Sequence, residues 1–231
     1  LQAAGVEISD GLMASAAREL NIGFVSRMTR GRPWLRLKVA ASLDGKTALH
    51  NGVSQWITGP EARQDGHRWR ARACAILTGI GTVRDDDPQL NVRDVDTPRQ
   101  PLKVVVDSKL ETPLSAKILR GGPVLIAAAV DDENKANLLR VAGAEVVVLP
   151  NPHGKVELLT LLEELARRGI NEVHAEAGFK LNGSLLREGL VDELLLYLAP
   201  CLIGDAASGL FNLPELTSLD GKRRLQIHDM R

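Results

Sequence analysis

Apolar and polar residues alternate along the stretch WLRLKVAAS, residues 34–42, and this pattern predicts a β-strand. Leu or Val stands at every second position in its middle, while Arg36, Lys38 and Ala40 occupy the positions between them. A period of two places one set on one face of a sheet and the other set on the opposite face. We therefore expect an apolar face toward a core and a second face that is either exposed or part of a cleft.

Further apolar runs of strand length follow, and helical patterns separate most of them. The predicted strands are residues 74–79, 103–108, 123–129, 144–150, 171–178 and 192–200, with a final edge strand at 223–230. The predicted helices are residues 60–73, 132–143, 155–169 and 180–190, the first preceded by a capping-box pattern formed by Thr58 and Glu61. Strands that alternate with helices indicate an α/β fold, with helices on both faces of a largely parallel central sheet.

The beginning of the chain has a different pattern of apolar residues from the rest. Apolar residues recur at helical spacing over residues 9–28, which predicts one helix, and the sequence TRGRP ends it. We interpret residues 1–31 as the tail of a preceding unit with a linker, and residues 32–231 as one domain. The chain begins at Leu1 rather than Met, which indicates a piece of a longer protein.

The composition is that of a soluble globular protein. Of 231 residues, 44% are hydrophobic and 25% are charged, with 29 basic and 29 acidic side chains. A net charge of zero favours neither nucleic acid nor an anionic membrane as a partner. The two cysteines, Cys74 and Cys201, form no CxxC pair, and no apolar run or leader indicates a membrane or an export route. We expect a cytoplasmic protein without a metal site.

Two glycine-containing turns at the ends of predicted strands are candidate ligand sites. In GFKLNGS, Gly178 and Gly183 have the spacing of a phosphate-binding loop and Ser184 follows, but the lysine of a nucleoside-triphosphate loop is missing. This segment either only turns the chain or holds a diphosphate with backbone amides and a helix dipole. In GIGTVR, Gly79 and Gly81 allow backbone amides to approach a ligand closely.

Several charged residues near these turns have two interpretations. Asp85–Asp87 form either a solvated loop or, with further ligands that the sequence does not reveal, a metal site. Arg63, His67 and Arg70 share one face of a predicted helix, which is either exposed or suited to a phosphate.

Glu176 is the least easily explained of the ionisable residues. It stands between two alanines at the end of an apolar strand, where a carboxylate needs a partner or a ligand. His174 is typical of an ordinary strand residue, and Trp56, in the loop SQWITG, is a candidate wall of a pocket.

Taken in order, these segments resemble the reductase domain of the bifunctional riboflavin biosynthesis deaminase–reductases. The segments are LKVAASLDGKTA, GVSQWITG, AILTGIGTVRDDDPQLNVR, VVVDS and EAGFKLNGSLLREGLVDELLLYLAP. The run D-D-D-P-x-L-x-V-R behind T-G-x-x-T-V is the most specific part of the match. The resemblance covers residues 33–231, and residues 1–31 resemble the end of the deaminase domain.

The resemblance implies a dihydrofolate-reductase-like fold and an NADPH-dependent reaction. The ribosyl chain of 5-amino-6-(5-phosphoribosylamino)uracil is reduced to a ribityl chain, and hydride goes to C1′ of the open sugar. By motif, the implied cofactor-contacting residues are Ala40, Trp56, Thr82, Asp86, Ser108, Gly178, Phe179, Lys180, Leu181, Asn182, Gly183 and Ser184. The implied substrate-binding residues are Ser54, Arg70, Leu90, Arg93 and Glu176.

Lys38 and Glu176 are the ionisable candidates for assisting ring opening or protonation. The family further implies a dimer with a deaminase domain before the reductase, although the zinc motif of that deaminase is absent from this chain. The turn departs from the family's E-G-G-P or E-G-G-A pattern at Ala177 and Phe179. The alternatives are a related reductase that acts before deamination and a non-catalytic domain that binds NADPH or a flavin precursor.

Overall fold

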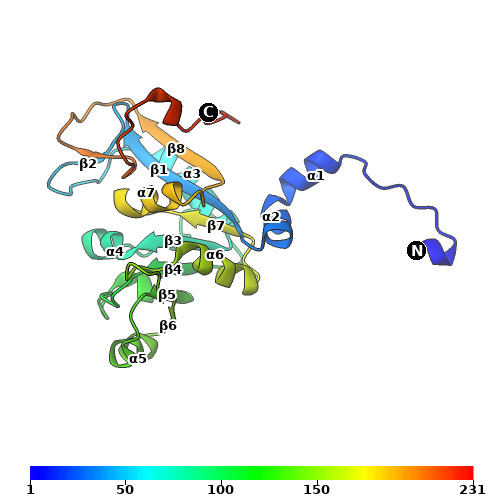
Figure 1. Ribbon diagram of the computed structural model, residues 1–231, viewed down its shortest axis with the longest axis horizontal. Coiled ribbons are helices and arrows are strands. Elements are labelled where there is room, and N and C mark those ends of the chain that lie inside the picture. The colour runs from blue at the N-terminus through cyan, green and yellow to red at the C-terminus, as the bar shows by residue number, and fades with distance from the viewer. Residues whose placement is uncertain (231) are drawn as a thin grey trace.

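A computed structural model describes residues 1–230 and shows a central sheet with helices on both sides (Figure 1). The strands of the sheet are β1 (Trp34–Ser42), β3 (Ala75–Gly79), β4 (Leu102–Val106), β5 (Val124–Ala128), β6 (Ala144–Val148), β7 (Glu172–Ala175) and β8 (Glu193–Ala199). They lie in the order β6-β5-β4-β3-β7-β1-β8, and each neighbouring pair is parallel. The predicted parallel α/β sheet is confirmed.

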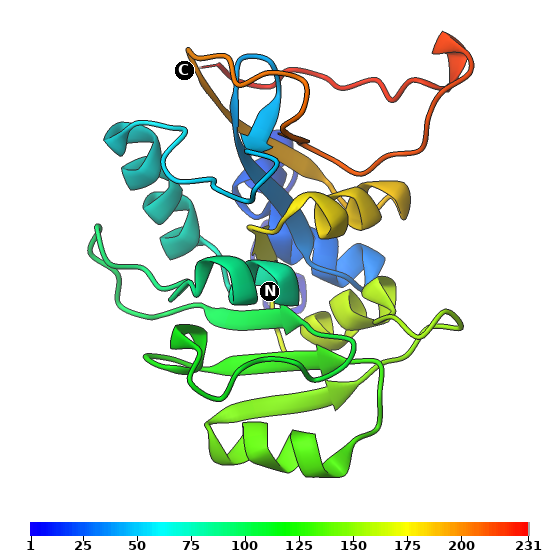
Figure 2. The same cartoon turned by 90° about the vertical axis from the view of Figure 1, so that its left-hand side faces the viewer.

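Two groups of helices cover the two faces of this sheet. The helices are α1 (Ala14–Leu20), α2 (Ile22–Arg30), α3 (Pro60–Arg72), α4 (Ile80–Asp86), α5 (Glu133–Val141), α6 (Leu158–Arg167) and α7 (Phe179–Arg187). Connections through α3, α4 and α5 carry the chain toward β6, whereas α6 and α7 carry it back toward β8. Since parallel crossovers are right-handed, the two groups lie on opposite faces. Figure 2 shows α3 and α7 on opposite sides of β1.

The face under α6 and α7 is apolar across most of the sheet. Leu37 of β1, Leu77 of β3 and Leu125 of β5 pack there with Leu161 and Leu165 of α6. Each fully buried leucine contributes about 1.5–3 kcal/mol by removal of apolar surface from water. This continuous core explains why the alternating pattern of β1 has one strictly apolar face.

The opposite face is divided into two unlike halves. Under α5, a second apolar cluster includes Ile76, Val105 and Ile126 from β3, β4 and β5. Under α3, the strands β7, β1 and β8 instead present polar side chains, which contact Arg70, Trp69 and Asp65 of that helix. The residues of these contacts on the sheet side are Glu176, which directly follows β7, Arg36 of β1 and Tyr197 of β8.

A short ribbon and a hydrogen-bonded turn lie beyond the end of β1. The strands β2 (Lys46–Ala48) and β9 (Ser208–Gly209) pair antiparallel. Asp44, in the turn before β2, accepts hydrogen bonds from the backbone amides of Ile203 at 3.1 Å and Gly204 at 2.7 Å. The two contacts hold the segment after β8 against the turn after β1.

The N-terminal segment extends from the body, and α2 attaches it (Figure 1). Arg27 donates a hydrogen bond from Nε to Asn171 Oδ1 at 2.7 Å, and a Cβ on Gly23 would overlap Asn171 and Glu172. The single helix predicted over residues 9–28 is instead two helices that meet at Asn21, whose backbone leaves the helical conformation. The domain boundary at residue 31 stays a prediction.

Three further details differ from the sequence-based expectations. Residues 223–230 form no strand, because no partner backbone pairs with them in the described chain. The helix α3 has Gly59 as its N-cap with no side-chain cap bond, so the expected capping box of Thr58 is wrong. Residues 80–86 form the helix α4, for which the sequence pattern predicted no helix. No helix within residues 1–230 combines the length and apolar character needed to cross a bilayer.

Candidate active site

The two glycine turns lie side by side at the carboxyl ends of the neighbouring strands β3 and β7. β3 leads into α4 on one face and β7 leads into α7 on the other, which is where α/β sheets bind ligands. A Cβ added to Gly178 would lie 3.7 Å from Thr82 Oγ1, and one added to Gly79 would lie 3.2 Å from Leu181 Cδ2. The two turns therefore touch, and a larger side chain would fill the space between them.

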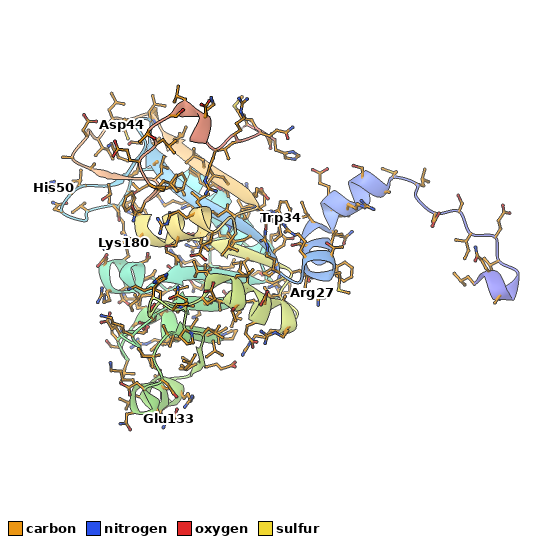
Figure 3. All side chains as sticks on the ribbon, viewed as in Figure 1. Arg27, Trp34, Asp44, His50, Glu133 and Lys180 are labelled. Carbon is orange, nitrogen blue, oxygen red and sulfur yellow. The ribbon has the colours of Figure 1, made fainter. Side chains whose placement is uncertain are left out.

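The N-terminus of α7 offers unpaired backbone amides. Gly178 is its N-cap in an extended conformation, and the amide of Asn182 is the first to bond back, to Gly178 O at 3.0 Å. The amides of Phe179–Leu181 therefore face out of the helix end, together with the positive end of the helix dipole. Figure 3 shows Lys180 at this end and His50 in the loop after β2, both on the side away from the N-terminal segment. Such a helix end suits a phosphate.

The rest of the predicted phosphate loop lies inside α7 and faces elsewhere. A Cβ on Gly183 would overlap the backbone of Asn212. Close packing against that backbone, and not a turn of the chain, is therefore the reason for a glycine at this position. The Ser184 hydroxyl donates to Lys180 O at 3.2 Å, and the Asn182 side chain is buried. The expectation that Gly183 and Ser184 approach the phosphate does not match these surroundings, because the helix already begins at Phe179.

An open hollow of about 800 Å³ lies between the loop that includes Ser54 and the end of α4. Asp85 and Asp86 line its other side. Burial and the charge of Asp85 raise the pKa of Asp86, and a hydrogen bond from Ser54 opposes this rise. An expected substrate position, Ser54, and an expected cofactor position, Asp86, thus share one hollow.

The third residue of the acidic run has a structural contact. Asp87 accepts a hydrogen bond from the backbone amide of Lys117 at 2.8 Å and lies 3.3 Å from the ammonium of the same residue. The backbone hydrogen bond is the main reason that the pKa of Asp87 is lowered. Within residues 1–230, no group of three or more His, Cys, Asp or Glu residues is placed to hold a metal ion.

Glu176 is the centre of a cluster of charged side chains directly after β7. Arg70 donates to both of its oxygens, at 2.5 Å from Nε and 3.0 Å from Nη2. Lys38 Nζ lies 3.9 Å from Oε2, and His174 Nε2 lies 3.4 Å from Oε1. Burial alone would raise the pKa of Glu176, but the charge of Arg70, the nearby His174, the hydrogen bonds from Arg70 and the charge of Lys38 hold it well below 4.5. Glu176 is therefore an ionised carboxylate at neutral pH.

The ammonium of Lys38 lies between this carboxylate and an aromatic ring. Its distance of 3.9 Å from Glu176 is too long for a hydrogen bond, and the centroid of the Tyr197 ring is 5.6 Å away. The side chain is 22% exposed. Nζ makes no hydrogen bond to any described residue, so its three N–H donors remain available to a ligand.

The two arginines expected at the substrate have different surroundings. Arg70 also donates to Asn91 O at 3.2 Å, so much of its guanidinium faces protein atoms rather than a phosphate site. Arg93 is exposed and donates only to Asn91 Oδ1, at 3.1 Å, among the described residues. His67 Nε2 lies 3.0 Å from Asp94 Oδ2, and burial, followed by the charge of Arg70, lowers the pKa of His67.

The other expected contact residues differ in exposure. Ala40 is half-buried on β1, and Ser108 follows β4 with its hydroxyl accepting a backbone N–H at 3.3 Å. Trp56 is 69% exposed, with the guanidinium of Arg63 4.6 Å from its ring centroid. Leu90 belongs to the second apolar cluster and is 4% exposed as a whole residue.

Sequence reasoning missed two groups under α3. Tyr197, the only tyrosine of the chain, donates from its hydroxyl to Asp65 Oδ2 at 2.6 Å. Arg36 lies 3.2 Å from Glu172 Oε2 and 2.9 Å from Glu193 Oε2. A tyrosine or arginine inside an otherwise apolar strand was the only available signal, and neither pattern indicates its partner.

Comparisons with known proteins agree with this geometry. The family model described as the RibD C-terminal domain matches residues 33–230. The riboflavin biosynthesis protein RibD of Escherichia coli is 40% identical over all of this chain, and that of Haemophilus influenzae is 39% identical. The chain spans 65% and 64% of the length of these two relatives.

Solved structures of the same kind have the same fold. A RibD structure from Acinetobacter baumannii has a TM-score of 0.87 at 39% identity, covering 99% of this chain and 63% of that one. A deaminase and 5-amino-6-(5-phosphoribosylamino)uracil reductase from Thermotoga maritima has a TM-score of 0.77 at 23% identity, covering 97% of this chain and 60% of that one. The expected dihydrofolate-reductase-like fold is confirmed by these neighbours. The chain belongs to the RibD C-terminal domain family.

Proposed function

We propose that this domain reduces the ribosyl chain of 5-amino-6-(5-phosphoribosylamino)uracil to a ribityl chain, with NADPH as the reductant. The observation that carries the proposal is the ammonium of Lys38, which has free donors and lies 3.9 Å from Glu176, the residue that follows β7 and precedes the glycine turn at Gly178. Membership of the family supports the reaction class.

The residues around the two glycine turns and the hollow at the end of α4 are suited to a dinucleotide. The outward amides of Phe179–Leu181 would hold its diphosphate, and the lack of a side chain at Gly178 keeps the space beside Thr82 open. Asp86 and Ser54 would border its nicotinamide side, because they share the hollow at the end of α4. Bound NADPH supplies the hydride, and the protein contributes its orientation against the sugar.

We assign Lys38 as the proton donor of the reaction. Ring opening breaks the bond between C1′ and the ring oxygen, and that oxygen needs a proton to become the 4′-hydroxyl. An ammonium with three free donors supplies this proton, while the amine nitrogen of the substrate forms a double bond to C1′. Hydride addition at C1′ then returns the electron pair to that nitrogen.

Glu176 has a different role from Lys38 in this proposal. Its pKa is held well below 4.5, so it is ionised and carries no proton to give. It attracts the ammonium of Lys38 across 3.9 Å and anchors Arg70 through two hydrogen bonds. Arg93 is exposed and makes one hydrogen bond, to Asn91, so it is a better candidate than Arg70 for binding the substrate phosphate.

The direct test follows the oxidation of NADPH by its absorbance, with each of two substrates supplied in turn. We expect turnover with the phosphoribosylaminouracil and little with the corresponding compound before deamination. Turnover of the second compound alone would assign the earlier reductase reaction instead. Tight binding of NADPH without turnover of either compound would favour a non-catalytic domain.

The context of the domain is also a proposal. We propose that a deaminase domain precedes it in the full-length protein, that residues 1–31 are the end of that domain with a linker, and that residues 32–231 form the reductase. The longer length of the curated relatives supports this arrangement. We further propose a homodimer in the cytoplasm, a location that agrees with the pathway and with the free Cys74 and Cys201.

A further inference from the structure

We propose that Tyr197 and Asp65 form a positioning pair that determines where the ammonium of Lys38 lies. Tyr197 is on β8, in register with Ala40, and its ring centroid is 5.6 Å from Lys38 Nζ. Its hydroxyl donates to Asp65 Oδ2 of α3 at 2.6 Å. The inference rests on the proposed function, because it explains how the proton donor is held.

Glu176 cannot hold Lys38 by itself. Both oxygens of that carboxylate already accept from Arg70, and Lys38 Nζ remains 3.9 Å from the nearer of them. A lysine side chain has a flexible four-carbon stem, so one long ion pair leaves its ammonium poorly located. The face of the Tyr197 ring attracts the ammonium from a second direction, as cation–π contacts within about 6 Å do.

Asp65 fixes the ring in turn. A hydrogen bond from a hydroxyl to a carboxylate at 2.6 Å is short and charge-assisted, so it sets the tilt of the ring. Asp65 belongs to α3, the helix that also supplies Arg70 to Glu176. One helix therefore sets both contacts of Lys38, the carboxylate through Arg70 and the ring through Asp65.

The kinetic test compares Tyr197→Leu, Tyr197→Phe and Asp65→Asn with Leu196→Ala, a change on the opposite face of β8. Loss of the ring should lower kcat about tenfold, since an ammonium 1 Å out of place reacts poorly, while KM for NADPH stays within about twofold. Tyr197→Phe keeps the ring but removes the hydrogen bond to Asp65, and Asp65→Asn weakens that bond, so both should lower kcat less than Tyr197→Leu does, with Asp65→Asn the milder of the two. Leu196→Ala should match wild type.

A second measurement needs neither substrate nor turnover. Acetylation of Lys38 by a water-soluble acetylating reagent is compared by peptide mass spectrometry with acetylation of the exposed Lys109 in the same sample. The ratio of Lys38 acetylation to Lys109 acetylation should rise severalfold in Tyr197→Leu and less in Asp65→Asn. The reason is that the Tyr197 ring covers one side of the Lys38 ammonium and shields it from the reagent. The ratio should stay unchanged in Leu196→Ala.

The outcomes separate the two proposals. A wild type that oxidises no NADPH with either substrate defeats the proposed function, while the acetylation ratio still reports on the contact. An unchanged ratio in Tyr197→Leu and Asp65→Asn overturns the positioning pair. So does an equal loss of kcat in Tyr197→Phe, Tyr197→Leu and Leu196→Ala, which would show only a structural role for β8. If Tyr197→Leu does not fold, Asp65→Asn decides between these results.

Discussion

The two halves of one sheet face each carry a lysine, and the two lysines have opposite surroundings. Lys103 of β4 lies in the apolar half and is 1% exposed, and its ammonium donates to Ile118 O and Arg120 O at 2.5 Å each. Lys38 of β1 lies in the charged half under α3 and donates to no described protein atom. Burial lowers the pKa of Lys103, which nevertheless has backbone acceptors for two of its donors.

The difference separates a structural lysine from one that is kept for a ligand. A buried donor with protein acceptors holds segments together, as Lys103 holds the loop before β5. Lys38 has only a long ion pair and a ring contact and is 22% exposed, so its N–H donors stay open to a ligand. Stability does not explain the ion pairs of the charged half either, because largely buried pairs such as Arg36 with Glu172 contribute little net stability.

The largest effect is expected at Lys38. Lys38→Met should lower kcat about 10²–10⁴-fold, the usual contribution of a positioned acid, while the free energy of unfolding changes by less than about 1 kcal/mol. Steady-state NADPH oxidation and a urea melt measure the two quantities. Retained turnover in this variant would show that Lys38 takes no part in the chemistry, and the functional contrast between Lys38 and Lys103 would then be wrong.

Lys103→Met is the matched control for that change. It removes a lysine from the same sheet face and leaves two buried carbonyls without a donor, which should cost about 1–3 kcal/mol of stability. The folded protein should keep the kcat of wild type. A loss of kcat as large as that of Lys38→Met would show that the two halves are not functionally distinct.

The apolar half should respond in stability alone. Ile126 of β5 is fully buried, and Ile126→Ala should reduce the free energy of unfolding by about 2–5 kcal/mol through lost burial and a cavity. NADPH affinity and kcat, corrected for the folded fraction, should stay within about twofold. A large change in either quantity at a temperature where the variant is folded would contradict this separation.

Gly183 tests which side of α7 meets the cofactor. A Cβ there would overlap the backbone of Asn212, so Gly183→Ala should destabilise the protein by about 1–3 kcal/mol and change NADPH affinity little. Gly66→Ala in α3 is the control, since a Cβ there meets nothing within 4 Å and the change should stabilise by up to about 1 kcal/mol. A loss of NADPH affinity in stably folded Gly183→Ala would instead support the original prediction that Gly183 lies at the phosphate site.

The smallest effect concerns Asp44, an exposed carboxylate outside both halves. Hydrogen bonds from Ser42, Gly204 and Ile203 lower its pKa from 3.8 to about 2. The contact is therefore present above pH 3.8 and is lost as pH falls through about 2. An NMR titration should show the Gly204 amide shifting with a midpoint near 2, and Asp44→Asn should abolish the shift. A midpoint near 3.8 would show that the amides do not bind this carboxylate in solution.

Local pattern was sufficient for the strands of the central sheet and for most helices. The strand predicted over residues 34–42 is β1 with the same limits, because a period of two is written directly in the sequence. Residues 223–230 carry a similar pattern without forming a strand, since a strand also needs a neighbouring backbone. The two glycine turns were recognised as candidate sites for the same local reason.

The sequence by itself determined the α/β fold, the family and the candidacy of Lys38 and Glu176. Only the tertiary structure decided how these residues act. It supplied Arg70 to Glu176 across 106 positions and Tyr197 to Asp65 across 132 positions, and it turned Gly183 toward Asn212. Local propensities act within a few residues, whereas a pKa, a free donor or a close backbone approach depends on groups that only folding brings together.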